Sequence, residues 1–150
     1  MAVTIEDLSI RDLDRLHEIE KQCFTDEAFT KEQIVQLLKD YNSIGLVARA
    51  DGRIVGFVLG MIHVDRKAMH GHILTIDISP TYRRRRVGQR LLQEMENIFK
   101  QKGVKTSHLE VREDNAAAIS LYIALGYKEI GKLENYYGNT HGIYFEKVLT

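Results

Sequence analysis

Hydrophobic and polar positions follow two different periods in the central part of the chain. Residues 73–78, ILTIDI, alternate between apolar and more polar side chains, which is typical of a β-strand. The segment 79–81, Ser-Pro-Thr, interrupts this strand. Apolar residues then recur at helical spacing, at Val87, Leu91, Leu92, Met95 and Phe99. The pattern predicts a strand, a tight turn and an amphipathic helix over residues 73–99.

The same signals predict the elements of the N-terminal half. Residues 3–5 are a candidate strand, and Ser9 or Asp12 can cap a helix with the apolar positions Leu13, Leu16, Ile19 and Phe24. Residues 30–33, TKEQ, form a capping-box pattern that begins a second helix, which ends at residues 41–43. Strands are expected over residues 44–50 and 53–63, joined by an Asp51-Gly52 hairpin turn. We expect a polar connection over residues 65–71.

The C-terminal half continues with alternating strands and helices. Lys102-Gly103 ends the central helix, and residues 108–112 alternate as a strand does. Asp114 or Asn115 caps the next helix, which Gly126 ends. Residues 127–132 and 143–149 are two last strands, joined by the ENYYGNTHG segment. This order predicts an α/β fold with a central mixed sheet and helices on both faces.

The strand–helix–strand unit over residues 73–112 should be a right-handed crossover between parallel strands. Ligands of such sheets bind at the carboxyl ends of the strands, which places a candidate site where the strand over residues 73–78 leads into the helix. Composition and length fit one domain over residues 1–150.

Charge and targeting signals narrow the function classes. The net charge is zero, from 21 basic and 21 acidic residues, which argues against a nucleic-acid partner. The first residues, MAVTIEDL, lack the basic and apolar regions of a signal peptide, and the apolar stretch 54–62 is too short to cross a membrane. Cys23 is the only cysteine, which fits a reducing cytoplasm.

Four consecutive arginines, residues 83–86, stand at the expected N-terminus of the central helix. A helix N-terminus already carries positive partial charge and favours anions, so this placement is unfavourable unless a polyanion binds there. Gly88 lets the backbone approach such a ligand closely. The segment is therefore predicted to hold a pyrophosphate; the alternative is a solvated basic turn.

Two segments resemble a known family. LTIDISPTYRRRRVGQRLL resembles the acetyl-coenzyme A motif of the GNAT acetyltransferases, and LEVREDNAAAISLYIALGYKEI resembles its continuation in ribosomal-protein N-terminal acetyltransferases. His72 and the pair Tyr136-Tyr137 are similar to residues of archaeal and eukaryotic N-alpha-acetyltransferase catalytic subunits. The resemblance covers residues 72–137 and implies the acyl-coenzyme A N-acyltransferase fold. One position departs from the family pattern, since Arg86 stands where the first loop glycine is usual.

The resemblance implies acetyl-coenzyme A as cosubstrate, with no metal required. Backbone groups of Ile76, Asp77 and Ile78 would lie along the pantetheine arm, and Asn115 and Tyr122 would bind its far end. The phosphate loop would comprise Arg83, Arg84, Arg85, Arg86, Val87, Gly88 and Gln89.

An α-ammonium group has a pKa of about 7.7–8.0, so a base must take its proton before it can attack a thioester. Glu110 is the candidate base, Tyr122 the candidate acid for the departing thiolate, and His72 a candidate for helping proton transfer. Each has a structural alternative: a solvent-facing carboxylate, a core tyrosine and a partly buried histidine. His72 and Glu110 alone would make a poor zinc site.

Glu27, Phe29, Tyr136 and Tyr137 are expected to form the walls of the peptide entrance, or else to close the end of the core. The predicted partner is a protein or peptide N-terminus, without nucleic acid or membrane. The alternatives are a small-amine acetyltransferase of the polyamine type and a non-catalytic module that binds acyl-coenzyme A or a nucleotide. Ribosome association, a homodimer and the preferred N-terminal residue stay undecided by the sequence.

Overall fold

The computed structural model of the protein describes residues 2–150. Its strands are β1 Val3–Asp7, β2 Ser43–Ala50, β3 Arg53–Asp65, β4 Ala68–Ile78, β5 Thr106–Arg112, β6 Lys128–Tyr137 and β7 Thr140–Val148. Its α-helices are α1 Leu13–Cys23, α2 Lys31–Lys39, α3 Val87–Gln101 and α4 Ala116–Ala124, with short 3-10 turns at Ile10–Asp12 and Pro80–Tyr82. Across these residues, no helix is both long and apolar enough to cross a membrane.

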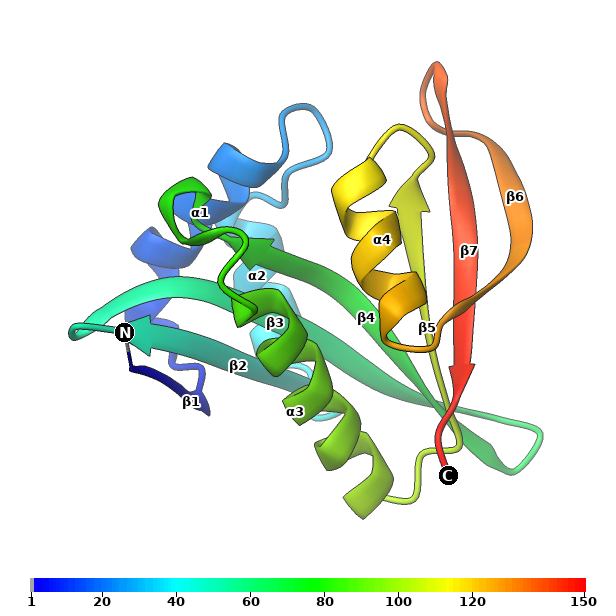
Figure 1. The fold of residues 1–150 in the computed structure, drawn as a ribbon. Coiled ribbons are helices and arrows are strands. Elements are labelled where there is room, and N and C mark those ends of the chain that lie inside the picture. The colour runs from blue at the N-terminus through cyan, green and yellow to red at the C-terminus, as the bar shows by residue number, and fades with distance from the viewer. Residues whose placement is uncertain (1) are drawn as a thin grey trace.

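The strands form one sheet in the order β1-β2-β3-β4-β5-β7-β6 (Figure 1). Only β4 and β5 pair in parallel, and the other neighbouring strands are antiparallel. The mixed sheet is therefore confirmed, as is the parallel strand–helix–strand unit around α3.

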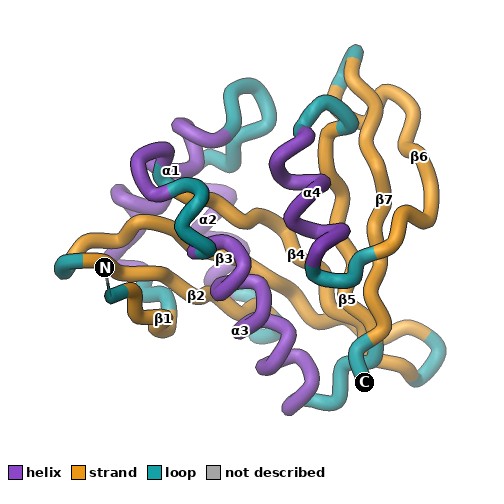
Figure 2. The backbone as a smooth tube through the Cα atoms, in the orientation of Figure 1, coloured by secondary structure: helices purple, strands orange, loops and turns teal. Residues whose placement is uncertain are grey.

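Two hydrophobic clusters hold helices on the two faces of the sheet (Figures 1 and 2). Leu91, Met95 and Phe99 of α3 are fully buried in one cluster. Leu16 and Ile19 of α1 are fully buried in the other, which also contains sheet residues. Burying each such side chain contributes roughly 1.5–3 kcal/mol, so the amphipathic pattern determines which face each helix covers.

Several boundaries differ from the sequence-based expectation. The prediction of a polar connection over residues 65–71 was wrong. Strands β3 and β4 instead form a hairpin that turns at Arg66 and Lys67, and both of these residues have a positive φ. Polar residues at the projecting end of a hairpin need no apolar face, so hydrophobic alternation does not reveal the strand there. The Asp51-Gly52 turn is confirmed, with φ values of 51° and 76°.

Three further boundaries shift. The arginine run precedes α3 instead of opening it, since the helix begins at Val87. Phe24 is extended and lies beyond the end of α1. The segment ENYY belongs to β6, which turns into β7 at Gly138 and Asn139. A strand at the sheet edge can carry polar residues on both faces, which conceals it in the sequence.

Strands β4 and β5 separate toward their carboxyl ends, as Figure 1 shows. Their pairing comprises only His70–Thr106, Gly71–Ser107 and His72–His108. Among the described residues, no strand pairs with residues 73–78 of β4 on the β5 side. The sheet thus opens into a gap at the ends of its two central strands, where the sequence placed the site.

Candidate active site

The gap between β4 and β5 offers an unpaired strand edge to a ligand. Residues Ile76, Asp77 and Ile78 form the end of this edge. Part of it is already occupied, because the carbonyl of Ile78 accepts hydrogen bonds from Cys23 Sγ at 3.4 Å and from Arg83 Nε at 3.3 Å. An extended chain with amide groups can pair with the other free backbone groups, as a strand would.

The loop before α3 suits a phosphate group by its backbone. Arg84 and Arg86 have φ values of 63° and 62°, and Arg86 caps the helix without a side-chain hydrogen bond. The first turn also contains no acidic residue. The N–H groups of this turn therefore face neither a capping side chain nor a carboxylate of the same turn. They include those of Val87, Gly88 and Gln89, and they can bind an anion.

The left-handed conformation of Arg86 explains why glycine is usual at this position of the family motif. Glycine adopts this conformation without steric cost, whereas a residue with a side chain loses of order 1–2 kcal/mol. Arg86 is exposed, so its side chain is not packed into the core. The arginine keeps the backbone shape and adds a positive charge.

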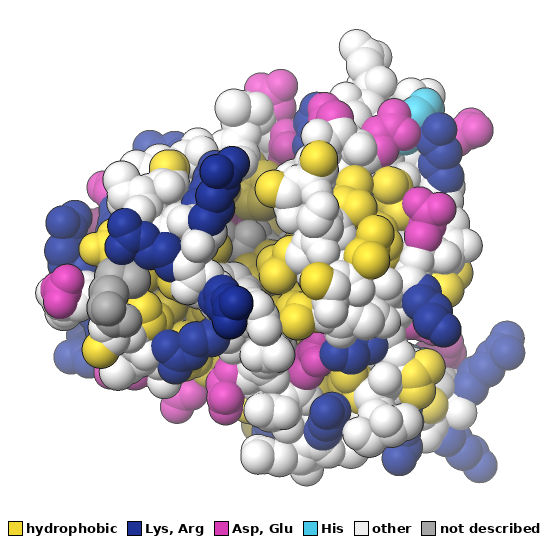
Figure 3. Space-filling model, in the orientation of Figure 1, with side chains coloured by type: hydrophobic (Ala, Val, Ile, Leu, Met, Phe, Trp, Pro, Cys, Tyr) yellow, Lys and Arg dark blue, Asp and Glu magenta, His cyan; other side chains and the backbone are white. Residues whose placement is uncertain are grey.

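Basic side chains gather over the N-terminal end of α3 (Figure 3). Arg85, Arg86 and Arg90 line a hollow of about 490 Å³ together with Val3 and Val87. The Arg85 guanidinium lies over the Tyr82 ring, and Arg90 Nη1 donates to the carbonyl of Val3 at 2.6 Å. These charges are positioned to neutralise a multiply charged anion.

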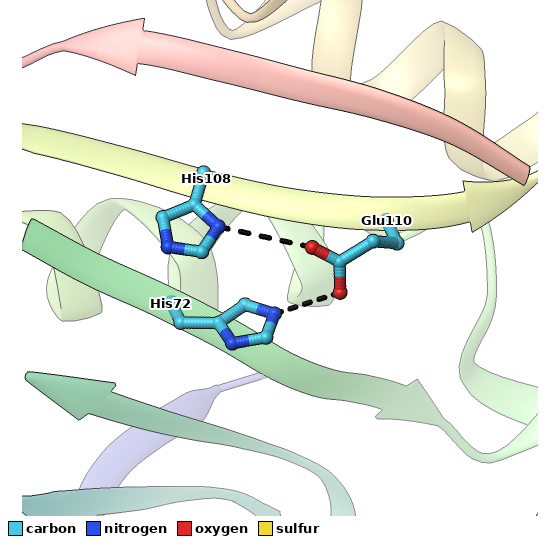
Figure 4. Close-up of side chains that lie close together, drawn as sticks. All are labelled: His72, His108 and Glu110. Carbon is cyan, nitrogen blue, oxygen red and sulfur yellow. Dashed lines mark hydrogen bonds and ion pairs between the residues drawn. The ribbon is translucent and has the colours of Figure 1, made fainter. Parts of the chain in front are cut away.

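Glu110 of β5 meets two histidines beside the start of the gap (Figure 4). Its Oε1 atom lies 2.8 Å from His72 Nε2 on β4, and its Oε2 atom lies 3.7 Å from His108 Nδ1. The rings of His72 and His108 stack with centroids 4.4 Å apart. All three side chains are largely buried, with 16% of the Glu110 side chain exposed. Glu110 is therefore no ordinary solvent-facing carboxylate.

The two histidines keep Glu110 ionised. Burial alone would raise its pKa, but the hydrogen bonds and positive charge available from His108 and His72 outweigh burial and lower the pKa to about 2. An ionised carboxylate attracts an ammonium group. A carboxylate of such low pKa is also a weak proton acceptor by itself, so His72 matters to any proton transfer here.

Further histidines extend this cluster toward solvent. His108 Nε2 lies 3.0 Å from Nε2 of the exposed His63, whose ring is 5.4 Å from that of His70. His70 Nδ1 lies 2.6 Å from Thr106 Oγ1. The sequence analysis gave no role to His63, His70 or His108. A signal for His108 was present, because it stands two residues before Glu110 on the same strand and so shares its face.

Tyr122 of α4 is buried, with 6% of its surface exposed, and its ring lies near those of Tyr127 and Phe145. Burial and the negative charge of Asp77 raise its pKa, so the phenol stays protonated and can donate a proton. The effect of Asp77 on this pKa means that the Tyr122 hydroxyl lies within electrostatic reach of the end of β4. Asn115 begins the same helix and accepts a hydrogen bond from Ala118 N at 3.2 Å, which leaves its amide NH₂ for another partner.

Residues expected at the peptide entrance are joined by one arginine. Arg112 of β5 contacts Glu27 at 3.4 Å, Thr140 Oγ1 at 3.1 Å and both carboxylate oxygens of Asp114. Its guanidinium also lies 5.8 Å from the centre of the Tyr137 ring. The structure thus connects the α1–α2 loop to the β6–β7 hairpin, and the sequence analysis did not identify this role of Arg112.

Tyr136 and Tyr137 contact each other edge to face, with ring centroids 4.9 Å apart. Burial and the charge of Glu110 raise the pKa of Tyr136. Burial, and to a smaller extent the charges of Tyr136 and Glu110, also raise the pKa of Tyr137. Both tyrosines therefore lie within electrostatic reach of the Glu110 carboxylate. Phe29 follows Glu27 in the α1–α2 loop, and its N–H donates to Glu20 at 3.0 Å.

A family model described as the Acetyltransferase (GNAT) family matches residues 13–127. An N-alpha-acetyltransferase from Sulfurisphaera tokodaii is 30% identical over 149 residues, which cover 93% of this chain and 89% of the relative. The N-alpha-acetyltransferase RimI from Mycobacterium tuberculosis is 34% identical over 137 residues, which cover 90% of this chain and 84% of the relative.

Among solved structures, Ard1 from Thermoplasma volcanium superposes on the chain with a TM-score of 0.90. It is 25% identical, and the alignment covers 100% of this chain and 99% of that protein. The resemblance read from the two sequence segments therefore extends over the whole fold.

Proposed function

Because the chain belongs to the Acetyltransferase (GNAT) family, we propose that it transfers the acetyl group of acetyl-coenzyme A to the free N-terminal amine of proteins or peptides. Family membership makes the protein an acetyl-coenzyme A-dependent N-acetyltransferase. The observation that carries the choice of reaction is the His72–Glu110 pair, which lies where β4 and β5 stop pairing. The activity named for the two relatives supports an N-terminal amine as the acceptor.

The residues around the gap fit acetyl-coenzyme A. The uncapped first turn of α3 and the arginines beside it suit the pyrophosphate. The free edge of β4 at Ile76–Ile78 suits the amide-containing pantetheine arm, and Asn115, just after the carboxyl end of β5, would bind the end of that arm. Bound there, acetyl-coenzyme A supplies the acetyl group as a thioester, and a backbone N–H at the end of β4 polarises its carbonyl.

Glu110 attracts the substrate ammonium and begins its deprotonation, either directly or through a water molecule. Because its pKa is only about 2, the proton does not remain on the carboxylate. His72 lies 2.8 Å away, and its Nε2–H donates to the ionised carboxylate and holds it in place. The proton passes from Glu110 through water to solvent. Glu110, oriented by His72, thus acts as the base, and the amine lone pair becomes free to attack the thioester carbon.

Tyr122 acts at the leaving group. When the new C–N bond has formed and the C–S bond breaks, the electron pair remains on sulfur, and Tyr122 donates a proton to this thiolate. Its raised pKa keeps that proton available throughout the physiological pH range. A thiol with a pKa near 8.5 already leaves readily, so Tyr122 accelerates the step without being indispensable.

Glu27, Phe29, Tyr136 and Tyr137 form the entrance through which the peptide reaches Glu110. The carboxylate of Glu27 is paired with Arg112, so this wall is less suited to a polycation than a free acidic mouth would be. The tyrosine hydroxyls can bond to peptide backbone groups. This entrance favours a peptide over a polyamine.

We place the enzyme in the cytoplasm, as one domain acting on protein N-termini. The test is thiol release from acetyl-coenzyme A with a panel of peptides that carry free or blocked N-termini, with and without lysine, plus spermidine. Turnover that requires a free peptide N-terminus supports the proposal. Turnover with spermidine or lysine side chains alone would make the protein a small-amine or lysine acetyltransferase. Binding of coenzyme A without any turnover would make it a non-catalytic module.

A further inference from the structure

We propose that His72, His108 and Glu110 form a binding site for a borderline transition-metal ion such as Zn²⁺ or Co²⁺, and that the ion inhibits the enzyme by occupying the place of the substrate amine. The metal-binding part rests on the cluster geometry alone. Only the inhibition rests on the proposed function.

The three side chains provide one ligand atom each within a small volume. The nitrogens of His72 and His108 and an oxygen of Glu110 all lie within 4.8 Å of one another. Zn–N and Zn–O bonds are about 2.0–2.2 Å long, so ligand atoms of a tetrahedral ion lie roughly 3.3 Å apart. The two rings now stack at an interplanar angle of 18°, so they would turn toward each other until both nitrogen lone pairs meet at the ion. Figure 4 shows both rings directing a nitrogen toward the carboxylate.

The His108 ring supplies an independent argument. Among the described residues, its Nδ1 atom is buried without a hydrogen-bond partner within normal distance, and it lies 3.7 Å from a Glu110 oxygen. If its Nε2–H donates to His63 Nε2, 3.0 Å away, then Nδ1 faces the carboxylate with a lone pair or with a second proton. Two acceptors directed at each other are unfavourable unless a proton or a metal ion lies between them. A proton on Nδ1 serves while the site is empty and helps to lower the pKa of Glu110, and a bound metal ion would replace that proton.

His63 fits the role of an outer partner. Histidine ligands of metal ions usually donate their second ring N–H to another group, which fixes the ring orientation. His63 occupies this position for His108, and its own side chain is exposed. The donor set of two imidazoles and one carboxylate suits Zn²⁺, Co²⁺ or Ni²⁺ better than Ca²⁺ or Mg²⁺, which prefer oxygen ligands.

Three protein ligands leave a fourth coordination position open. Because Glu110, oriented by His72, is the proposed base, a bound ion would neutralise the carboxylate and compete with the substrate ammonium for it. The pyrophosphate loop before α3 contains none of the ligands. Inhibition should therefore be competitive with the peptide and should leave the affinity for acetyl-coenzyme A unchanged.

The experiment is a titration of the tag-free full chain with Co²⁺, followed by its visible d–d absorption, and with Zn²⁺ by calorimetry, both without substrate. We expect one ion per chain, with at least about a tenfold loss of affinity in His108→Asn and in His72→Asn. His70→Gln is the matched control, because His70 belongs to the same histidine cluster but bonds to Thr106. Cys23→Ser excludes the lone thiol as a ligand.

No absorption band, or binding that persists unchanged in His108→Asn, would overturn the site. His63→Gln should weaken binding by about tenfold, since only the outer partner is lost. Metal binding that depends on His108 in a protein without peptide acetylation would refute the proposed function alone. Peptide acetylation in a protein that binds no Co²⁺ would refute the metal site alone.

Discussion

The Nε2 atom of His72 lies 2.8 Å from Oε1 of Glu110, although 38 positions separate the two residues in the chain. Parallel pairing of β4 with β5 brings them together, because His72 stands opposite His108 and Glu110 follows His108 on the same face of β5. The pair lies just before the strands diverge. The same pairing thus creates both the proposed base and the gap that it serves.

Replacing Glu110 with Gln should lower kcat by about 10²–10⁴-fold, because the amide cannot take part in proton transfer. The dissociation constant of acetyl-coenzyme A, measured by calorimetry, should change little. Glu113→Gln is the matched control, because Glu113 is exposed and its carboxylate forms a surface ion pair with Lys132. Equal rates in Glu110→Gln and the control would remove Glu110 from the mechanism.

Local patterns were sufficient to predict most of the fold but not its irregularities. Thr30 and Gln33 form the expected capping box, since capping depends on residues close in sequence. The β-bulge at Leu74 was not predicted: Leu59 pairs with Thr75 and Gly60 with Ile73, so Leu74 is an additional residue. Ile73 consequently packs in the α3 cluster, whereas Thr75 bonds to Glu20 of α1. Simple alternation would place both on one face.

The site shows the same division between local and long-range information. Glu110, Tyr122 and the arginine loop were identified because they stand in recognisable segments. His108 and Arg112 were missed, because their importance comes from partners 45 and 85 positions away, His63 and Glu27. Sequence periodicity reveals the face on which a side chain lies. Which side chains meet there depends on strand register, which one sequence does not fix.

Tyr122→Phe should reduce kcat by about tenfold or more without abolishing activity, because the thiolate loses its proton donor but remains a fair leaving group. The KM values should stay close to those of the wild type. Tyr127→Phe is the matched control, since its hydroxyl bonds to Ser107 Oγ at 2.7 Å and its loss should affect stability more than rate. The proposed acid would be wrong if Tyr122→Phe turned over as fast as the wild type.

The loop conformation at Arg86 can be tested with two substitutions. Arg86→Gly should preserve acetyl-coenzyme A binding to within a few-fold, because glycine adopts a φ of 62° freely and the backbone N–H groups remain. Arg86→Val should weaken binding by about tenfold, since a β-branched residue loses of order 1–3 kcal/mol in that conformation. Calorimetric titration with coenzyme A measures both. Equal losses in the two variants would mean that charge, not backbone shape, determines affinity.

Arg112→Lys should raise the KM for the peptide several-fold while the KM for acetyl-coenzyme A stays unchanged. Lysine cannot reproduce the contacts that the guanidinium makes to Glu27, Thr140 and Asp114 at the same time. The two walls of the entrance would then lose their common support. Lys132→Ala removes a surface ion pair nearby and serves as the control. Parallel increases in both KM values would instead indicate a general loss of structure.

A buried carboxyl group should make stability depend on pH in an unusual direction. Asp77 is fully buried, and its Oδ1 accepts a hydrogen bond from Thr75 Oγ1 at 2.5 Å. Burial raises its pKa well above the ordinary value, and a hydrogen bond and negative charge from Glu20 raise it further. The folded state therefore holds a proton that the unfolded state, with a pKa of about 3.9, releases at lower pH.

The folded protein binds more protons than the unfolded chain between these two pKa values, so the free energy of unfolding falls as pH rises through that range. The contribution of Asp77 is complete below about pH 3.9 and decreases by at most about 1.4 kcal/mol per pH unit until the folded pKa is reached. Asp77→Asn, which carries no titrating group, should flatten this slope in urea unfolding measured at successive pH values. The exposed Asp26→Asn should leave the slope as it is. If Asp77→Asn left the wild-type slope unchanged, Asp77 would be ionised in the folded protein and its charge would be compensated. Arg83 is the cation within electrostatic reach that could compensate it.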